Sequence, residues 1–123
     1  MNLVLSILIA AVMIGGGAAH LASPAQFAAL VPPFLPAVPV LYATGVLQIG
    51  IGIAALLPRS RALAGIAFAA LCLGYLPLHL WDFFRFDPVF APPLAATIRV
   101  AVQLLFIWAG YTLWRRAGGK APR

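Results

Sequence analysis

Residues 37–80 read AVPVLYATGVLQIGIGIAALL, then PRSR, then ALAGIAFAALCLGYLPLHL, and this stretch decides the fold. Each apolar run is about 20 residues long, and a helix of that length crosses the ~30 Å hydrocarbon core of a bilayer. The basic segment between the runs allows only a tight connection, so the two helices must lie side by side in opposite directions. The stretch therefore predicts a helical hairpin that spans a membrane twice.

Two further apolar runs flank this hairpin, and together they predict four spans, over residues 2–20, 37–57, 62–80 and 94–114. Within hydrocarbon every backbone N–H and C=O must bond inside its own segment, which favours helices; the alternation typical of a transmembrane β-strand is absent. Charged residues make up only 8% of the chain and hydrophobic residues 64%, whereas soluble domains carry about 25% charged residues. The sequence thus predicts a single all-α membrane domain, residues 1–123, folded as a four-transmembrane-helix bundle.

The basic residues predict how this bundle is oriented. Six of the eight Lys and Arg residues lie in the 58–61 turn or after residue 114, on the same side of a four-span bundle. Because such loops face the cytoplasm, both termini are expected there, with the chain in the cell (inner) membrane and a disordered basic tail over 117–123. The first span resembles a signal peptide but lacks the positive residues that precede one, so we expect it to be retained. The charges lie at the ends of apolar runs rather than on one face, so no nucleic-acid partner is expected.

The connections between the spans carry signals of their own. Ser23 can cap a helix, Pro24 suits its first position and Gln26 completes a capping box. These residues predict a short interfacial helix over 24–30 in the first outer loop. The second outer loop, 81–90, is aromatic and is expected to lie at the same interface.

Small residues recur four apart in three of the spans, a spacing that lets helices approach closely in lipid. The pairs are Gly15 and Ala19, Gly50 and Ala54, and Gly65 and Ala69. We expect helix-packing faces at these pairs. The alternative is that they reflect only the abundance of Ala and Gly.

The few polar residues of the spans fall in the outer half or the middle of the predicted bundle. A polar group in hydrocarbon needs a partner, so helices that carry polar groups at overlapping depth favour a shared interior cluster. We therefore predict an outward-facing polar cavity. Its candidate ligand-binding residues are His20, Gln48, Tyr75, His79, Asp82, Arg99 and Gln103.

Arg99 is the most informative of these residues, because an arginine inside a span is costly in lipid. One interpretation is that its side chain extends to the outer head groups. The other is that it faces the bundle interior beside Gln103 and needs an acceptor. Asp82 is the nearest acid in this topology, and Gln48, Tyr75 or a neutral histidine are alternative hydrogen-bond partners. If none of these engages Arg99, an anionic or carbonyl-bearing ligand is the remaining partner.

No arrangement typical of a catalytic site is recognisable in the sequence, so we expect no enzymatic activity from the chain on its own. Two histidines and the single cysteine, Cys72, make a poor set of metal ligands, and one cysteine forms neither an internal disulfide nor a CxxC pair. The histidine pair alone gives little support for haem. No cofactor motif is evident, and a quinone is the one cofactor that the predicted cavity suggests.

Several short motifs follow one another along the chain. They include Gly17-x-x-His20, Val31-Pro32-x-x-Leu35-Pro36, Tyr42-x-x-Gly45-Val46-x-Gln48 and Arg99-x-x-x-Gln103. In order and spacing they resemble the DoxX-like family of small four-helix membrane proteins, over nearly the whole chain. The family pattern usually has Glu at the position of Gln48 and often Asn at that of His79, so an acid that would pair with Arg99 is missing here. The resemblance implies a relation to the small membrane subunit of thiosulfate:quinone oxidoreductase, to oxidative-stress complexes and, distantly, to receptor-assembly proteins.

Three functions follow as expectations. The first is a small membrane subunit of a redox or quinone-linked complex. The second is a non-enzymatic accessory or assembly protein, and the third is a binder or transporter of a small hydrophobic or anionic molecule. The expected partners are the lipid bilayer together with a partner protein or further copies of the chain.

Overall fold

The computed structural model describes residues 2–118, and the regular structure within that range is entirely helical. The elements in chain order are α1 (Asn2–Ala22), α2 (Pro24–Phe27), the 3-10 turn η1 (Ala28–Leu30), α3 (Ala37–Leu56), α4 (Arg61–Trp81) and α5 (Leu94–Arg116). Four of them, α1, α3, α4 and α5, are long and apolar enough to cross a membrane. Their bounds lie close to those of the four predicted spans.

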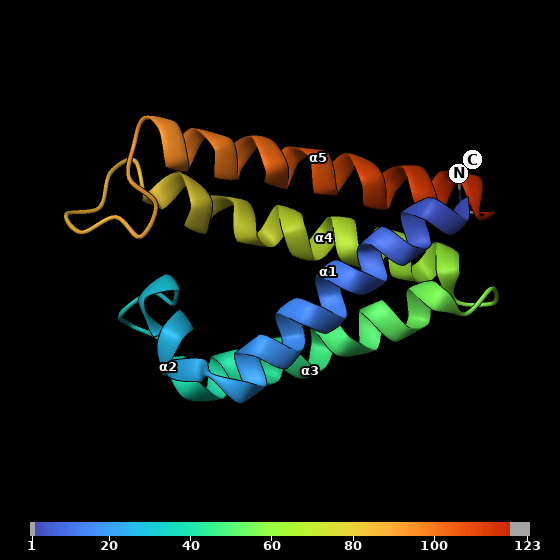
Figure 1. Ribbon diagram of the computed structural model, residues 1–123, viewed down its shortest axis with the longest axis horizontal. Helices are drawn as coiled ribbons and strands as arrows, with labels where there is room; N and C mark the ends of the chain where they lie inside the picture. The colour runs from blue at the N-terminus through green and yellow to red at the C-terminus, as the bar shows by residue number, and fades with distance from the viewer. Residues whose placement is uncertain (1, 119–123) are drawn as a thin grey trace.

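The long helices form two antiparallel pairs, α1 with α3 and α4 with α5 (Figure 1). The two pairs meet at the end of the bundle that holds both chain termini and the turn between α3 and α4. They separate toward the other end, where α2, η1 and the connection over 82–93 lie. We call these the convergent end and the divergent end. The helical bundle agrees with the prediction, whereas the separation of the pairs has no counterpart in the sequence pattern.

The apolar core fills the convergent end. Ile9, Ala55, Phe68 and Leu113 come from the four long helices, belong to one cluster and are each at most 1% exposed. Because burial and packing of such side chains hold helices together, this cluster ties the two pairs to each other. Nearer the divergent end the buried side chains include Gln48 and His79 instead.

Close backbone approaches hold each pair together. A Cβ added at Gly17 of α1 would lie 2.5 Å from the carbonyl oxygen of Gly45 in α3, and one at Gly65 of α4 would lie 2.8 Å from that of Gly110 in α5. A Cβ added at Gly110 would in turn lie 2.9 Å from the backbone nitrogen of Ala69. The predicted packing face at Gly65 and Ala69 is therefore confirmed.

In the other two small-residue pairs, the glycines do not lie at close helix contacts, although Ala54 packs against the core cluster. A Cβ added at Gly15 or Gly50 would meet nothing within 4 Å. The close contacts lie two residues further along each helix, at Gly17 in α1 and at Gly52 in α3, whose added Cβ would lie 2.6 Å from a side-chain carbon of Ile14. Since a helix turns about 100° per residue, a shift of two residues moves to nearly the opposite face.

Side chains from the short turn satisfy the last carbonyl groups of α3. The Ser60 hydroxyl donates to the carbonyl of Ala54 at 2.8 Å, and the Arg61 Nε–H donates to that of Ala55 at 3.3 Å. Carbonyl groups at the end of a helix lack their usual i+4 donor, and that of Ala54 also accepts the N–H of Leu57 at 3.3 Å, so these hydrogen bonds fix where α3 stops. The turn is thereby held in the geometry that places α4 beside α3.

Ser23 does not cap α2, contrary to the prediction. Its side chain makes no capping hydrogen bond, and its backbone N–H donates to the carbonyl of Ala19 at 2.9 Å. Ser23 therefore closes the last turn of α1, with a ψ of 60° that differs from the extended backbone of an N-cap. The single helix expected over 24–30 is a turn of α-helix followed by η1. Of the predicted tail, residues 119–123 lie outside the described residues.

Candidate functional site

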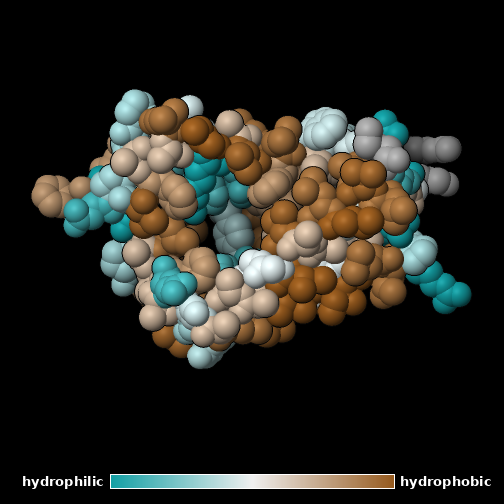
Figure 2. Space-filling model, viewed as in Figure 1, coloured by the Kyte–Doolittle hydropathy of each residue, from teal (hydrophilic) through white to brown (hydrophobic). Residues whose placement is uncertain are grey.

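A cavity of about 400 Å³ lies between the two helix pairs toward the divergent end. Figure 2 shows the hollow from the side of the bundle, between the two pairs. Its walls are mostly apolar and come chiefly from α3, α4 and the segment from Leu30 to Leu35. The polar side chains in its lining are His20, Thr44, Gln48, Tyr75, His79 and Arg99. Five of the seven predicted site residues thus line one cavity.

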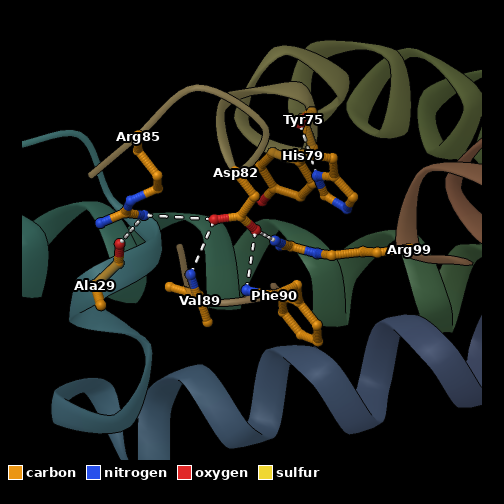
Figure 3. A network of polar contacts seen from close by, with 8 residues as sticks. All are labelled: Ala29, Tyr75, His79, Asp82, Arg85, Val89, Phe90 and Arg99. Carbon is orange, nitrogen blue, oxygen red and sulfur yellow. Dashed lines mark hydrogen bonds and ion pairs between the residues drawn. The ribbon is translucent and has the colours of Figure 1, made fainter. Parts of the chain in front are cut away.

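The Arg99 side chain turns toward Asp82 rather than away along α5, and Figure 3 shows this contact. Its Nη1 donates to Oδ2 of Asp82 at 3.0 Å, and its guanidinium lies 4.4 Å from the ring centroid of Phe90. The Arg99 side chain is 18% exposed and that of Asp82 is 1% exposed. Of the two interpretations of Arg99, the structure agrees with the one in which the side chain faces the bundle interior. Its acceptor is Asp82, the nearest acid.

Asp82 is held by the backbone of the loop that follows it. Its Oδ1 accepts the N–H of Val89 at 3.0 Å and its Oδ2 accepts the N–H of Phe90 at 3.3 Å. With Arg99, these bonds engage both carboxylate oxygens. The carboxylate therefore organises the 82–93 connection as well as the start of α5.

Arg85 joins the two sides of the divergent end. Its Nη1 donates to the carbonyl oxygen of Ala29 in η1 at 2.9 Å and lies 3.9 Å from Oδ1 of Asp82. Its guanidinium also lies 4.0 Å from the Trp81 ring centroid. The contact with Ala29 links the connection after α4 to the connection after α2, across the gap between the helix pairs.

A second polar link crosses the cavity from α3 to α4. The Nε2 of Gln48 donates to the hydroxyl oxygen of Tyr75 at 3.1 Å, which leaves the Tyr75 O–H able to donate to another acceptor. One turn further, Nδ1 of His79 lies 2.9 Å from the carbonyl oxygen of Tyr75. A carbonyl oxygen accepts but does not donate, so this ring nitrogen carries the proton.

His20 and Thr44 complete the polar lining at the α1–α3 pair. The hydroxyl of Thr44 donates to the carbonyl of Val40 at 2.9 Å and lies 3.4 Å from Nδ1 of His20. The His20 ring meets the ring of Phe27 edge-on, with centroids 4.8 Å apart. The short helix α2 therefore fixes the orientation of His20.

Gln103 lies beside His79 but is not part of the cavity lining. Its Nε2 donates to the carbonyl oxygen of Cys72 at 2.7 Å, and the residue is 5% exposed. It joins α5 to α4 one helical turn further along α5 than Arg99. Gln103 lies on the same face of α5 as Arg99, as the spacing of four residues predicted. At the depth of Gln103 this face packs against α4 and does not border the cavity.

Three contacts of the site had no signal in the sequence: those of Arg85 with Ala29, Phe90 with Arg99, and Val89 with Asp82. All three involve the irregular connections, where no periodicity predicts which groups meet. Among residues 2–118, no group of three or more His, Cys, Asp or Glu side chains is placed to hold a metal ion. The groups that the cavity lining does present are hydrogen-bond donors and acceptors among apolar side chains.

Removing the Tyr75 hydroxyl tests the link across the cavity. Tyr75→Phe is expected to lower the free energy of unfolding by about 1 kcal/mol, because the amide of Gln48, which is 4% exposed, loses its acceptor. Tyr111→Phe, at an exposed position of α5 toward the convergent end, is the matched control. Thermal unfolding in detergent measures both. A Tyr75→Phe/Gln48→Leu double variant should cost less than the sum of the single changes, and strictly additive costs would contradict the link.

Residues 9–113 match a family model described as "Domain of unknown function (DUF8561)". The matched region reaches from the first half of α1 into the last turns of α5 and includes every residue of the cavity lining. No curated protein and no solved structure matches the chain.

Proposed function

The chain belongs to the family described as Domain of unknown function (DUF8561), and we propose that it is an integral membrane protein that holds the head group of a lipophilic molecule between its helix pairs. The observation that carries the proposal is the cavity of about 400 Å³, within the size range of small-molecule sites. Its walls are apolar, and Arg99 and Tyr75 supply the N–H and O–H donors. An oxygen-bearing head with an apolar body fits such a lining.

The role proposed for this binding is that of a DoxX-like small membrane subunit of a redox complex, with a quinone as the bound molecule. The donors at Arg99 and Tyr75 suit the carbonyl oxygens of a quinone. The chain carries no cofactor motif, so electrons would come from a partner protein. Binding a quinone in a subunit of this kind positions it for reaction with that partner.

A quinone titration tests the proposal. The purified protein in lipid nanodiscs is titrated with a short-chain ubiquinone analogue while tryptophan fluorescence is followed. We expect saturable binding that weakens about tenfold or more in Arg99→Leu, because a charge-assisted hydrogen bond is lost. Arg59→Leu, at an exposed position of the convergent end, is the matched control and should bind as the unaltered protein does. Binding that is absent, or equal in all three proteins, would refute the proposal.

A second candidate is an accessory or assembly protein that binds no small molecule. The observation that favours it is the ion pair of Arg99 and Asp82, because a partnered arginine needs no ligand. This candidate predicts a partner protein that co-purifies equally well with the unaltered chain and with Arg99→Leu. Loss of the partner from Arg99→Leu would instead favour the cavity as the functional element.

The proposed orientation places the convergent end in the cytoplasm. Arg59, Arg61, Arg115 and Arg116 lie at that end, and the positive-inside tendency of membrane proteins supports the assignment. Single cysteines at Phe86, which is 100% exposed in the 82–93 connection, and at Arg59 test it in a Cys72→Ala background. A membrane-impermeant maleimide is expected to label Phe86→Cys in intact cells and Arg59→Cys only after lysis. The reverse pattern would overturn the orientation.

A further inference from the structure

We infer that the cavity selects a neutral carbonyl head over a carboxylate or phosphate head, and that Asp82 is the residue that sets this selectivity. The inference rests on the proposed function, because it assumes that the cavity holds a lipophilic molecule. It goes further by naming the charge of the head group. An arginine in an apolar cavity would ordinarily suggest an anion, so the argument turns on what surrounds Arg99.

The first step is the state of the charge on Arg99. Among residues 2–118, Arg99 is the one Arg or Lys side chain that lines the cavity. Its Nη1 lies 3.0 Å from Oδ2 of Asp82, whose side chain is 1% exposed. At this distance and burial the charges of Arg99 and Asp82 largely cancel, so the net charge that the pair presents to the cavity is close to zero. A guanidinium has five N–H donors, and the pairing uses one of them.

The second step is that Asp82 cannot move aside. Its two oxygens also accept the N–H groups of Val89 and Phe90, as Figure 3 shows. Rotating the carboxylate away from Arg99 would break these two hydrogen bonds together with the ion pair, which is costly. The negative charge is therefore fixed beside the guanidinium whether or not a ligand is present.

The third step concerns the remaining positive charge. Arg85 also approaches Asp82, but at 3.9 Å, and its Nη1 bonds the carbonyl of Ala29 at 2.9 Å. It lies at the outer edge of the divergent end and is not part of the cavity lining. The Arg85 side chain is 15% exposed and directs its hydrogen bond to η1, so it offers no donor to a head group held beside Arg99.

The consequence is a preference for neutral acceptors. A carbonyl oxygen gains a hydrogen bond from an N–H of Arg99 and brings no charge. A carboxylate gains a stronger bond but comes to lie near the fixed carboxylate of Asp82, in surroundings where like charges repel strongly. Ketones and quinones are therefore the preferred ligand class, and fatty acids and anionic lipids are disfavoured.

A matched series of one chain length tests the inference. Tridecanone, tridecanoic acid and tridecane are titrated separately into the protein in neutral detergent, and binding is followed by tryptophan fluorescence. We expect the ketone to bind about tenfold or more tightly than the acid, with the alkane weaker than the ketone. An acid that binds as tightly as the ketone, or more tightly, would overturn the selectivity while leaving the proposed binding function intact. If none of the three binds, both the selectivity and the proposed function are refuted.

The variant Asp82→Asn tests whether the charge of Asp82 sets the selectivity. The amide has the shape of the carboxylate and still offers an acceptor to one backbone N–H, but it carries no charge. We expect the affinity for tridecanoic acid to rise about tenfold and that for tridecanone to change much less. Asp87→Asn, in the same connection but exposed, is the control and should change neither. An unchanged acid affinity in Asp82→Asn would overturn the role of Asp82; should that variant not fold, the comparison of ketone and acid in the unaltered protein decides the inference.

Discussion

Replacing Gly17 with valine is expected to lower the free energy of unfolding by about 3 kcal/mol or more and to separate α1 from α3. An added Cβ at this position would lie 2.5 Å from the carbonyl oxygen of Gly45, 2.8 Å from a side-chain carbon of Ile49 and 3.1 Å from Cβ of Gln48. The first of these is a backbone atom, so relief requires a shift of a whole helix rather than a change of rotamer. Valine adds two methyl groups beyond that carbon.

Gly15→Val is the matched control for this change. It lies two residues away in the same helix, carries the same change in helix propensity and meets nothing within 4 Å of an added Cβ. Thermal unfolding followed by circular dichroism in one detergent should show Gly15→Val close to the unaltered protein and Gly17→Val far below it. Equal unfolding temperatures for the two variants would contradict the packing of α1 against α3.

The contrast between Gly15 and Gly17 also explains what the sequence could predict of the fold. Helix positions follow from apolar run length, because a bilayer demands about 20 residues and internal hydrogen bonding. The face that a helix presents depends on its partner, which run length does not reveal. The spacing at Gly65 and Ala69 identified the correct face, whereas that at Gly15 and Gly50 missed by two residues.

The candidate site was predictable where polar groups lie inside helices. His20, Gln48, Tyr75, His79 and Arg99 were expected to converge because lipid offers them no hydrogen-bond partners, and the structure places all five in one cavity lining. That these residues line an open space results from the separation of the helix pairs, which the sequence did not predict. The space between the pairs is what makes the polar cluster a cavity rather than a closed network.

The contacts of the connections could not be predicted in the same way. Arg85 reaches the carbonyl oxygen of Ala29 across 56 positions of sequence, and Phe90 covers the guanidinium of Arg99. Both depend on the backbone path of the 82–93 connection, which Asp82 holds in place. Asp82 is thus the residue on which the irregular part of the site depends most.

Removing the Asp82 side chain is accordingly the second change with a large expected effect. Asp82→Ala should lower the free energy of unfolding by about 3–5 kcal/mol, because breaking a buried ion pair leaves an uncompensated charge. Arg99 loses its acceptor at 3.0 Å, and the N–H groups of Val89 and Phe90 lose theirs. The loss therefore comprises the close ion pair with Arg99, the longer one with Arg85 and two backbone hydrogen bonds at a single position.

Asp87→Ala is the control that separates this effect from a general loss of negative charge. The two residues are the only acids of the chain, both lie in the 82–93 connection, and Asp87 is exposed whereas Asp82 is 1% exposed. Each variant raises the formal net charge by one, so a difference between them reports the local contacts. Unfolding in detergent should be affected strongly by Asp82→Ala and by less than about 0.5 kcal/mol by Asp87→Ala.

Arg99→Ala in the Asp82→Ala background distinguishes an unpaired charge from a merely disrupted loop. If the uncompensated guanidinium accounts for most of the cost, removing it should restore part of the stability that Asp82→Ala loses. If the two backbone hydrogen bonds account for it, the double variant should be no more stable than Asp82→Ala. Restoration of stability would establish that Asp82 acts on Arg99 through its charge, which the proposed selectivity for neutral head groups requires. No restoration would make Asp82 a support of the loop alone and remove the physical basis of that selectivity.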